Sequence, residues 1–277
     1  MAEESLEPGV WPGGARCAVM LTFDFDAESL WLSRDPAVAE RPGILSQGGY
    51  GANVGVPRIL DLLAAQGVRA TFFIPGWVAE RHPDQARAIR DAGHEIGHHG
   101  YLHERASPAD PEGERRAFAR GLEALQQVLG VRPLGYRSPG WDLTPITLEL
   151  VRGAGMLYSS NLMDHAWPYL HRHPEGDVVE LPVQWLLDDA PFFLFNPHLI
   201  NRPMAMPQLV LEQWQEELLG ARELGGLFNL TMHPQVIGHP SRLRLLRRLI
   251  ETITGLDGVW LATGTEVARH WLGRAGR

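Results

Sequence analysis

The sequence predicts an α/β protein built as a TIM-like barrel of seven or eight strand–helix units. Short apolar runs alternate with amphipathic helical patterns along most of the chain, which is typical of parallel strands with helices outside them. A doubly wound open sheet would be expected to carry a glycine fingerprint after its first strand, but that position has the sequence FDFDAE. The 277 residues fit one barrel domain.

The expected strands are short runs of apolar residues. They cover residues 18–23, 70–74, 94–97, 134–137, 178–183, 227–232 and 259–262. The expected helices carry apolar residues three or four positions apart, and several end at a glycine. They cover residues 54–66, the segment that ends at 92, 111–129, 144–154, 207–224, 241–254 and a closing segment after 262.

Two segments fall outside this alternation. Residues 1–17 form a short N-terminal extension that is acidic and rich in proline and glycine in its first part, without the basic and apolar regions of a signal peptide. Residues 18–277 are then one barrel domain. The longest irregular stretch, residues 30–53, is rich in glycine, proline and serine, and such a loop in a compact domain is usually a lid or a binding loop.

The composition excludes several classes of protein. A net charge of −8 and a pI near 5.8 argue against nucleic-acid binding, which needs a basic surface. No apolar run approaches the roughly 20 residues that cross a bilayer, so we expect no membrane partner and a cytoplasmic location. Cys17 is the single cysteine, which excludes an internal disulfide and favours a small buried residue.

Polar residues follow the ends of several expected strands. Asp24 and Asp26 lie at the end of the first expected strand, and His99 and His103 follow the third. Arg137 and His233 lie at the ends of two later strands. In a parallel barrel the carboxyl ends of the strands meet at one edge, where the loops build the active site. We therefore expect these side chains to converge.

The segment HGYLH predicts a metal site. His99 and His103 are four residues apart, so in a helical turn they would face the same side and share one ion. Asp26 is a suitable third ligand, and two histidines with one carboxylate leave positions open for water and substrate. His98 could replace His99, but strand alternation should point it to the opposite face. Zinc suits this ligand set best, although cobalt or nickel would also fit.

The remaining groups suggest acid–base chemistry. Asp24 and Asp26 share one strand face, and two close carboxylates repel unless a cation or a proton separates their roles. One is then free to act as a base. Arg137 could hold Asp24 ionised through a charge-assisted bond, and His233 could protonate a leaving amine.

In this order, the motifs TFDFD, HGYLH, RSPGW and LTMHP resemble those of the polysaccharide deacetylase family over residues 18–271. The chain looks most like the branch without signal peptides, which includes enzymes labelled peptidoglycan deacetylases and also allantoinases. It departs from the common pattern because one residue separates the two acids and because Ala27 and Glu28 follow where many members have glycine. The resemblance implies a distorted (β/α)7–8 barrel.

The resemblance also implies residue roles. Asp24 would be the general base, Arg137 its partner and His233 the general acid. Asp26, His99 and His103 would bind the one divalent ion. Either Asp188 or Asp189 would orient His233. Some ring-opening relatives are thought to work without metal, but all three ligand positions are kept here.

The substrate is less well defined by the sequence. Aromatic and loop residues that could line the substrate pocket are Trp31, Pro139, Gly140, Trp141 and Trp185. The first hypothesis is N-deacetylation of an N-acetylated sugar or glycan. The alternative is hydrolysis of a small linear or cyclic amide such as an imide, a hydantoin or allantoin. A non-catalytic binding protein on the same barrel is a distant third. The resemblance to this branch also implies a homo-oligomer, such as a tetramer.

Overall fold

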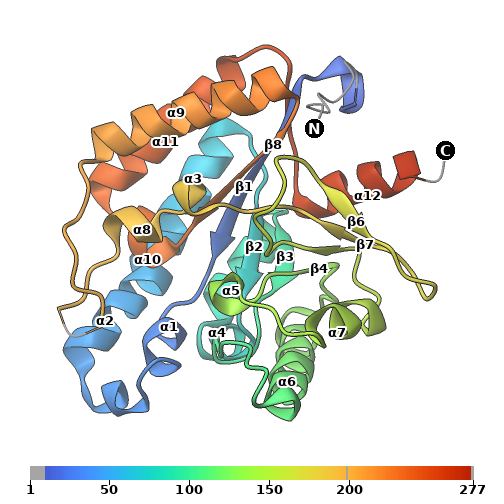
Figure 1. Ribbon diagram of the computed structural model, residues 1–277. Coiled ribbons are helices and arrows are strands. Elements are labelled where there is room, and N and C mark those ends of the chain that lie inside the picture. The colour runs from blue at the N-terminus through green and yellow to red at the C-terminus, as the bar shows by residue number, and fades with distance from the viewer. Residues whose placement is uncertain (1–9, 198, 276–277) are drawn as a thin grey trace.

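A computed structural model describes residues 10–197 and 199–275. Its centre is the buried parallel strand β1 (Cys17–Asp24), which pairs with β2 (Thr71–Ile74) on one side and with β8 (Leu227–Met232) on the other. β9 (Val259–Leu261) pairs with the first residues of β1. In Figure 1, β1 and β8 run side by side through the middle of the molecule.

The sheet runs in the order β6-β7-β5-β4-β3-β2-β1-β8. The outer strands are β3 (Glu95–His98), β4 (Gly135–Tyr136), β5 (Tyr158–Ser159), β7 (Val178–Glu180) and β6 (Tyr169–His171). All are parallel except β6, which pairs with β7 in the antiparallel sense. Asn229 on β8 donates to the carbonyls of Leu181 and Pro182 just beyond β7. The curled sheet confirms the predicted distorted barrel.

Helices cover the outside of the curled sheet (Figure 1). The longer ones are α3 (Val56–Gln66), α5 (Pro83–Asp91), α6 (Pro111–Leu129), α7 (Thr147–Gly153), α9 (Pro207–Leu224), α11 (Pro240–Gly255) and α12 (Gly264–Ala275). The shorter ones are α1 (Ser29–Leu32), α2 (Pro42–Tyr50), α4 (Gly76–Arg81), α8 (Ala190–Phe193) and α10 (Pro234–Ile237). Within the described part of the chain, no helix has the length and apolarity needed to span a bilayer.

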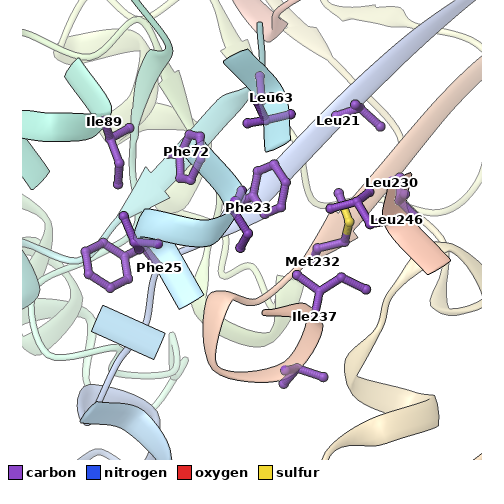
Figure 2. Close-up of a cluster of buried hydrophobic side chains, with 14 of the residues drawn as sticks. Leu21, Phe23, Phe25, Leu63, Phe72, Ile89, Leu230, Met232, Ile237 and Leu246 are labelled. Atoms are coloured by element: carbon purple, nitrogen blue, oxygen red, sulfur yellow. The ribbon is translucent and has the colours of Figure 1, made fainter. Parts of the chain in front are cut away.

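The main core lies between β1, its neighbours and the helices that pack on them (Figure 2). All eight residues of β1 are buried, which explains its nearly continuous apolar sequence. The rings of Phe23 and Phe72 stack with centroids 4.7 Å apart. Leu63 and Leu246, on α3 and α11, belong to the same cluster. This rigid layer supports the strand ends that carry the polar residues.

The segment 30–53 is not an irregular loop, and this expectation was wrong. It forms α1, a 3-10 turn (Pro36–Glu40), α2 and a π-helical turn (Gly51–Gly55) that continues into α3. Its glycines serve close packing: a Cβ on Gly48 would lie 2.5 Å from the Ala27 backbone, and one on Gly55 would lie 2.3 Å from the Pro234 carbonyl oxygen. Glycine often indicates a loop, whereas here it allows a helix to pack closely against the backbone of a neighbouring segment.

Smaller differences concern boundaries. The helix expected over 144–154 begins only at Thr147, and the helical segment before 92 is two helices separated at His82. Pro83 begins the second of these because proline suits the first turn of a helix. The short strands β5 and β6 were not expected. In the segment assigned to the N-terminal extension, Trp11 is buried and donates from Nε1 to the Gly225 carbonyl; residues 1–9 lie outside the described part.

Cys17 should be inert in the folded protein. Its side chain is fully buried, and burial raises the pKa of the thiol to about 11, so little thiolate forms at mildly alkaline pH. We expect no reaction of the native protein with a disulfide reagent and one equivalent of reaction after denaturation, measured by release of the chromophoric thiol. A native thiol that reacts as fast as free cysteine would contradict the packing of β1.

Gly135 on β4 should not tolerate alanine. A Cβ there would lie 1.9 Å from Cζ of Tyr158, whose buried ring is held by a bond from its hydroxyl to Glu95. We expect Gly135→Ala to lower the free energy of unfolding by about 1 to 3 kcal/mol, the usual cost of overpacking, measured by urea denaturation. The control is Gly153→Ala on α7, where no atom lies within 4 Å; it should be neutral or stabilising by up to about 1 kcal/mol. Equal effects would contradict the prediction.

Candidate metal centre and active site

The structure brings Asp26, His99 and His103 together. His99 Nε2 lies 3.5 Å from Asp26 Oδ1, and His103 Nε2 lies 3.7 Å from Asp26 Oδ2. One ligand atom from each of the three residues falls within 4.8 Å of the others. All three side chains are buried, although they come from segments far apart in sequence. Their donor atoms face a common point.

The chemistry of this donor set fits a divalent cation. His99 donates from Nδ1 to the Arg137 carbonyl at 2.6 Å, which fixes the ring and leaves Nε2 free to bind a metal. Burial lowers the pKa of His103 to about 4 despite the nearby Asp26, so its ring is neutral. Burial would raise the pKa of Asp26, but His103 and His99 hold it below its usual value. Asp26 Oδ1 is buried without a hydrogen-bond partner among the described residues, and a cation would satisfy it.

His99 and His103 do not lie in a helical turn, contrary to expectation. Gly100 and His103 have positive φ values of 72° and 61°, so the HGYLH segment is an irregular loop. Its backbone is held from both sides: Gly100 accepts from the amide of Gly76, while Glu104 accepts from the amides of Tyr101 and Leu102. The two imidazole rings still meet, with centroids 5.1 Å apart. His98 points away, buried against Phe118, as strand alternation predicted.

Arg137 holds Asp24 beside the metal ligands. Its Nη1 donates to Asp24 Oδ1 at 2.9 Å and to Thr22 at 2.8 Å, while Nη2 donates to Ser160 at 2.9 Å. The guanidinium is fully buried and lies over the Phe73 ring at 4.2 Å. Asp24 Oδ2 lies 3.8 Å from His99 Nε2. Asp24 is therefore fixed by one oxygen and directs the other toward the metal centre.

His233 approaches the same centre from the end of β8. Its Nε2 lies 3.7 Å from Asp26 Oδ2, and its Nδ1 bonds to Asp189 Oδ1 at 2.7 Å. Asp189 Oδ2 also accepts from the His233 amide at 3.0 Å. Asp188 is farther from Nδ1, at 3.6 Å, and accepts from the Ala190 amide instead. Of the two candidates, Asp189 thus makes the orienting contact.

The charges around His233 favour its protonated form. Burial alone would lower its pKa, but Asp189, then Asp188 and Asp26, raise it well above the usual value. For Asp188, burial and then the neighbouring Asp189 raise the pKa to about 7, against the influence of His233. A charged imidazole with Nε2 toward the site is the state that a proton donor needs.

The proposed substrate-binding residues divide into two groups. Trp31 is fully buried and belongs to the main core, so its ring offers no exposed face to a substrate in this structure. Trp185 is 50% exposed and stacks on Trp141 with centroids 4.4 Å apart. Pro139 is buried, whereas Gly140 is exposed beside it. The Trp141–Trp185 pair therefore remains the candidate aromatic surface.

Backbone strain concentrates in the same loops. In the described part of the chain, the non-glycine residues with positive φ are Ala27 (46°), His103 (61°) and Trp141 (59°). Such residues cost about 1 to 3 kcal/mol each and persist where the surroundings hold them, often at functional sites. Ala27 follows Asp26 directly, which gives a reason why glycine is common there in the resembling sequences.

Sequence reasoning missed several supporting residues. Thr22, Ser160 and Asn229 surround the guanidinium of Arg137, and Gln235 lies 3.4 Å from Asp26 Oδ2 through Nε2. One signal was available: Thr22 and Asn229 are polar residues within otherwise apolar strands, and buried polar groups need partners. Ser160 directly follows the two-residue strand β5, and Gln235 lies in the four-residue helix α10, so no periodic pattern marks either of them.

Comparison with known proteins identifies the family of this chain. Residues 15–159 match the family model described as polysaccharide deacetylase. The chain belongs to this family. The peptidoglycan deacetylase of Helicobacter pylori is 31% identical, over 91% of this chain and 94% of that protein. As a polysaccharide deacetylase family member, the chain is a hydrolase of carbon–nitrogen bonds.

Solved structures of similar proteins extend the comparison. A Mycobacterium smegmatis protein assigned to the polysaccharide deacetylases is 45% identical with a TM-score of 0.93, covering 96% of this chain and 93% of that one. Puue allantoinase is 26% identical with a TM-score of 0.83, covering 95% and 92%. T48 deacetylase, solved with substrate, is 23% identical with a TM-score of 0.56, covering 94% and 92%, which shows the shared fold alone.

Proposed function

We propose that the chain is a metal-dependent hydrolase that removes the acetyl group from an N-acetylated sugar or glycan. The observation that carries this proposal is the convergence of Asp26, His99 and His103 between a carboxylate, Asp24, and a histidine, His233. These are the groups that amide cleavage by water requires: a cation site, a base and an acid. The similarity to peptidoglycan deacetylase supports the choice of substrate.

The residues divide the reaction between them. A divalent ion, zinc by preference, would be held by Asp26, His99 and His103 and would make bound water a stronger nucleophile. Asp24 takes a proton from the attacking water, and the bond from Arg137 holds Asp24 in its orientation. His233 gives a proton to the departing nitrogen, so the amide and one water become an amine and an acid. Asp189 stabilises the charged His233.

The backbone near Gly140 is the candidate donor to the developing oxyanion. Pro139 has no amide proton, and the Trp141 amide already donates to the Ser138 carbonyl at 2.9 Å. Among residues 139–141, the Gly140 amide is the one that donates no hydrogen bond to another described residue. Gly140 is exposed and has a positive φ of 70°, so its amide can face a bound substrate. A backbone donor of this kind stabilises the negative charge of the transition state.

Hydrolysis of a small cyclic amide is a second candidate function. The fold similarity to Puue allantoinase supports it, as does the deep burial of the polar centre, where Asp26 and His99 are 0% and 1% exposed. The helices of residues 30–53 pack on the turn that follows Asp26, which leaves less room for a polymer than an open groove would. A compact substrate fits such a site.

A substrate panel distinguishes the two candidates. N-acetyl sugars, muropeptides, imides and hydantoins would be assayed for released amine or opened ring, with zinc-loaded enzyme and with enzyme treated with a chelator. Turnover of N-acetylated glycans that stops on chelation supports the first candidate, and turnover of cyclic amides alone supports the second. Equal rates with loaded and chelated enzyme would refute metal dependence.

Asp189→Asn should separate the roles of the two adjacent aspartates. Asparagine cannot stabilise a charged His233, so we expect kcat to fall by at least about a hundredfold, a typical contribution of acid–base catalysis. Asp188→Asn, the matched control, should change kcat by less than about tenfold because Asp188 lies farther from Nδ1. Both proteins should keep their metal, measured by elemental analysis. A larger loss in the Asp188 variant would reverse the assignment.

A further inference from the structure

Three arginines lie on loops that also carry the catalytic motifs. Arg34 follows α1, which begins three residues after Asp26, and Arg105 is two residues after His103. Arg202 lies in the segment between α8 and α9. All three are exposed. None is part of the hydrolytic machinery described above, so their common location needs another explanation.

Contacts place two of these side chains at the rim of the active site. The Nε atom of Arg105 lies 3.5 Å from the position of a Cβ on Gly140, so its guanidinium lies along the exposed RSPGW loop. Arg202 donates from Nη2 to the Ala190 carbonyl at 2.5 Å, directly after Asp189. Arg105 therefore contacts the RSPGW loop, and Arg202 contacts the residue that follows the His233 partner Asp189.

The third arginine, Arg34, lies on the turn that follows Asp26. Ser29 donates from its amide and from its hydroxyl to the Asp26 carbonyl, and the Arg34 amide donates to the Trp31 carbonyl, so the end of α1 that carries Arg34 is held next to this metal ligand. Burial lowers the pKa of Arg34, and the charges of Arg105 and Arg202 lower it further while Asp26 raises it, as expected for an arginine near the other two and near the polar centre.

These arginines lack acidic partners. Among the described residues, no carboxylate forms an ion pair with Arg34, Arg105 or Arg202, although the chain as a whole has a net charge of −8. Like charges that act on one another repel, and exposed guanidiniums each present several N–H donors. Planar donor sets of this kind match carboxylate and phosphate oxygens. An anion at this position would relieve the repulsion and satisfy the donors.

We propose that Arg34, Arg105 and Arg202 bind an anionic group, a carboxylate or a phosphate, carried by the amide substrate. The inference rests on the proposed hydrolase function and narrows its substrate class from neutral to negatively charged amides. The cleaved amide lies at the metal centre, while the anionic group lies at the rim and sets the orientation of the molecule. Neutral analogues would then be poor substrates.

Matched substrate pairs test this inference by kinetics. The pairs are N-acetylglucosamine with N-acetylmuramic acid or N-acetylglucosamine 6-phosphate, and hydantoin with hydantoin-5-acetic acid. We expect the wild type to prefer a charged member, and we expect Arg34→Gln and Arg105→Gln each to lower kcat/KM for it by at least about tenfold. The neutral member should change by less than about twofold. The control, Arg87→Gln, removes the same charge from the exposed surface of α5 and should change neither.

Binding measurements keep the inference separate from the hydrolase proposal. Calorimetry with the zinc-loaded Asp24→Asn protein measures affinity for each probe without turnover. Tighter binding of a carboxylate or phosphate probe, lost when Arg34→Gln and Arg105→Gln are added, supports the anion site even if no probe is hydrolysed. Which probe binds identifies the anion. Equal binding of charged and neutral probes, no binding of any, or equal loss for both members of a pair would overturn the inference.

Discussion

Asp24→Asn should leave a folded, metal-containing protein that has lost at least about a hundredfold in kcat, a typical contribution of a general base. Asparagine keeps the size of the side chain and can still accept the bond from Arg137 Nη1, but it cannot take a proton from water. Because Asp24 lies beside the ligands and not among the three that converge, the bound metal should remain. The measurement is steady-state kinetics together with metal content.

Asp142→Asn is the matched control for this variant. It makes the same chemical change at an exposed aspartate just after the RSPGW loop and should leave kcat within about twofold, since surface substitutions are usually near neutral. Activity of Asp24→Asn within a few-fold of the wild type would remove Asp24 from the role of base. Loss of its metal would instead make Asp24 a ligand.

His103→Ala should abolish metal binding and, with it, activity. Removing one of three protein ligands leaves only Asp26 and His99, which is too few for a stable catalytic site. We expect about one zinc per chain in the wild type and background levels in the variant, measured by elemental analysis after gel filtration. A full equivalent of metal in the variant would defeat the ligand assignment.

Thermal stability gives a second measurement on the same pair of proteins. A ligand that binds the native state raises the melting temperature, so a chelator should lower it in the wild type and leave it unchanged in His103→Ala. His173→Ala, which removes an exposed histidine, should behave like the wild type. A chelator shift that persists in His103→Ala would show that the ion is held elsewhere.

The sequence predicted that the active-site candidates converge, because the end of each strand can be recognised from the local sequence. Asp24 and His233 follow long apolar runs, and parallel strands bring such ends to one edge. It could not predict the HGYLH loop with its positive φ at His103, since this loop is held by bonds that the Glu104 carboxylate accepts and by one that the Gly76 amide donates. HxxxH spacing alone favours a helical turn. The expected helical turn and the observed loop nevertheless both place His99 and His103 on the same side.

The contacts that hold Arg137 could not be predicted from the sequence either. The partners of Arg137 come from β1, from the end of β5 and from β8, and no spacing within the sequence relates them. Trp31 gives a second example, because its place near a catalytic motif suggests a substrate wall, while burial in the core cluster depends on tertiary packing. Pattern identifies which residues are polar or apolar, whereas only the folded chain shows which surface each one faces.

The glycines that press α2 and the start of α3 onto the catalytic turns restrict how this enzyme can diversify. Any side chain larger than hydrogen at Gly48 or Gly55 would push against the backbone of Ala27 or Pro234, and so would disturb Asp26 and His233 together. Residues 30–53, which have the composition of a variable lid, are therefore packed in a fixed position between the turn after Asp26 and the turn after His233. New substrate preferences should therefore arise in the loops around residues 105–107 and 199–206, which contain none of the residues assigned here to the metal site or to acid–base chemistry.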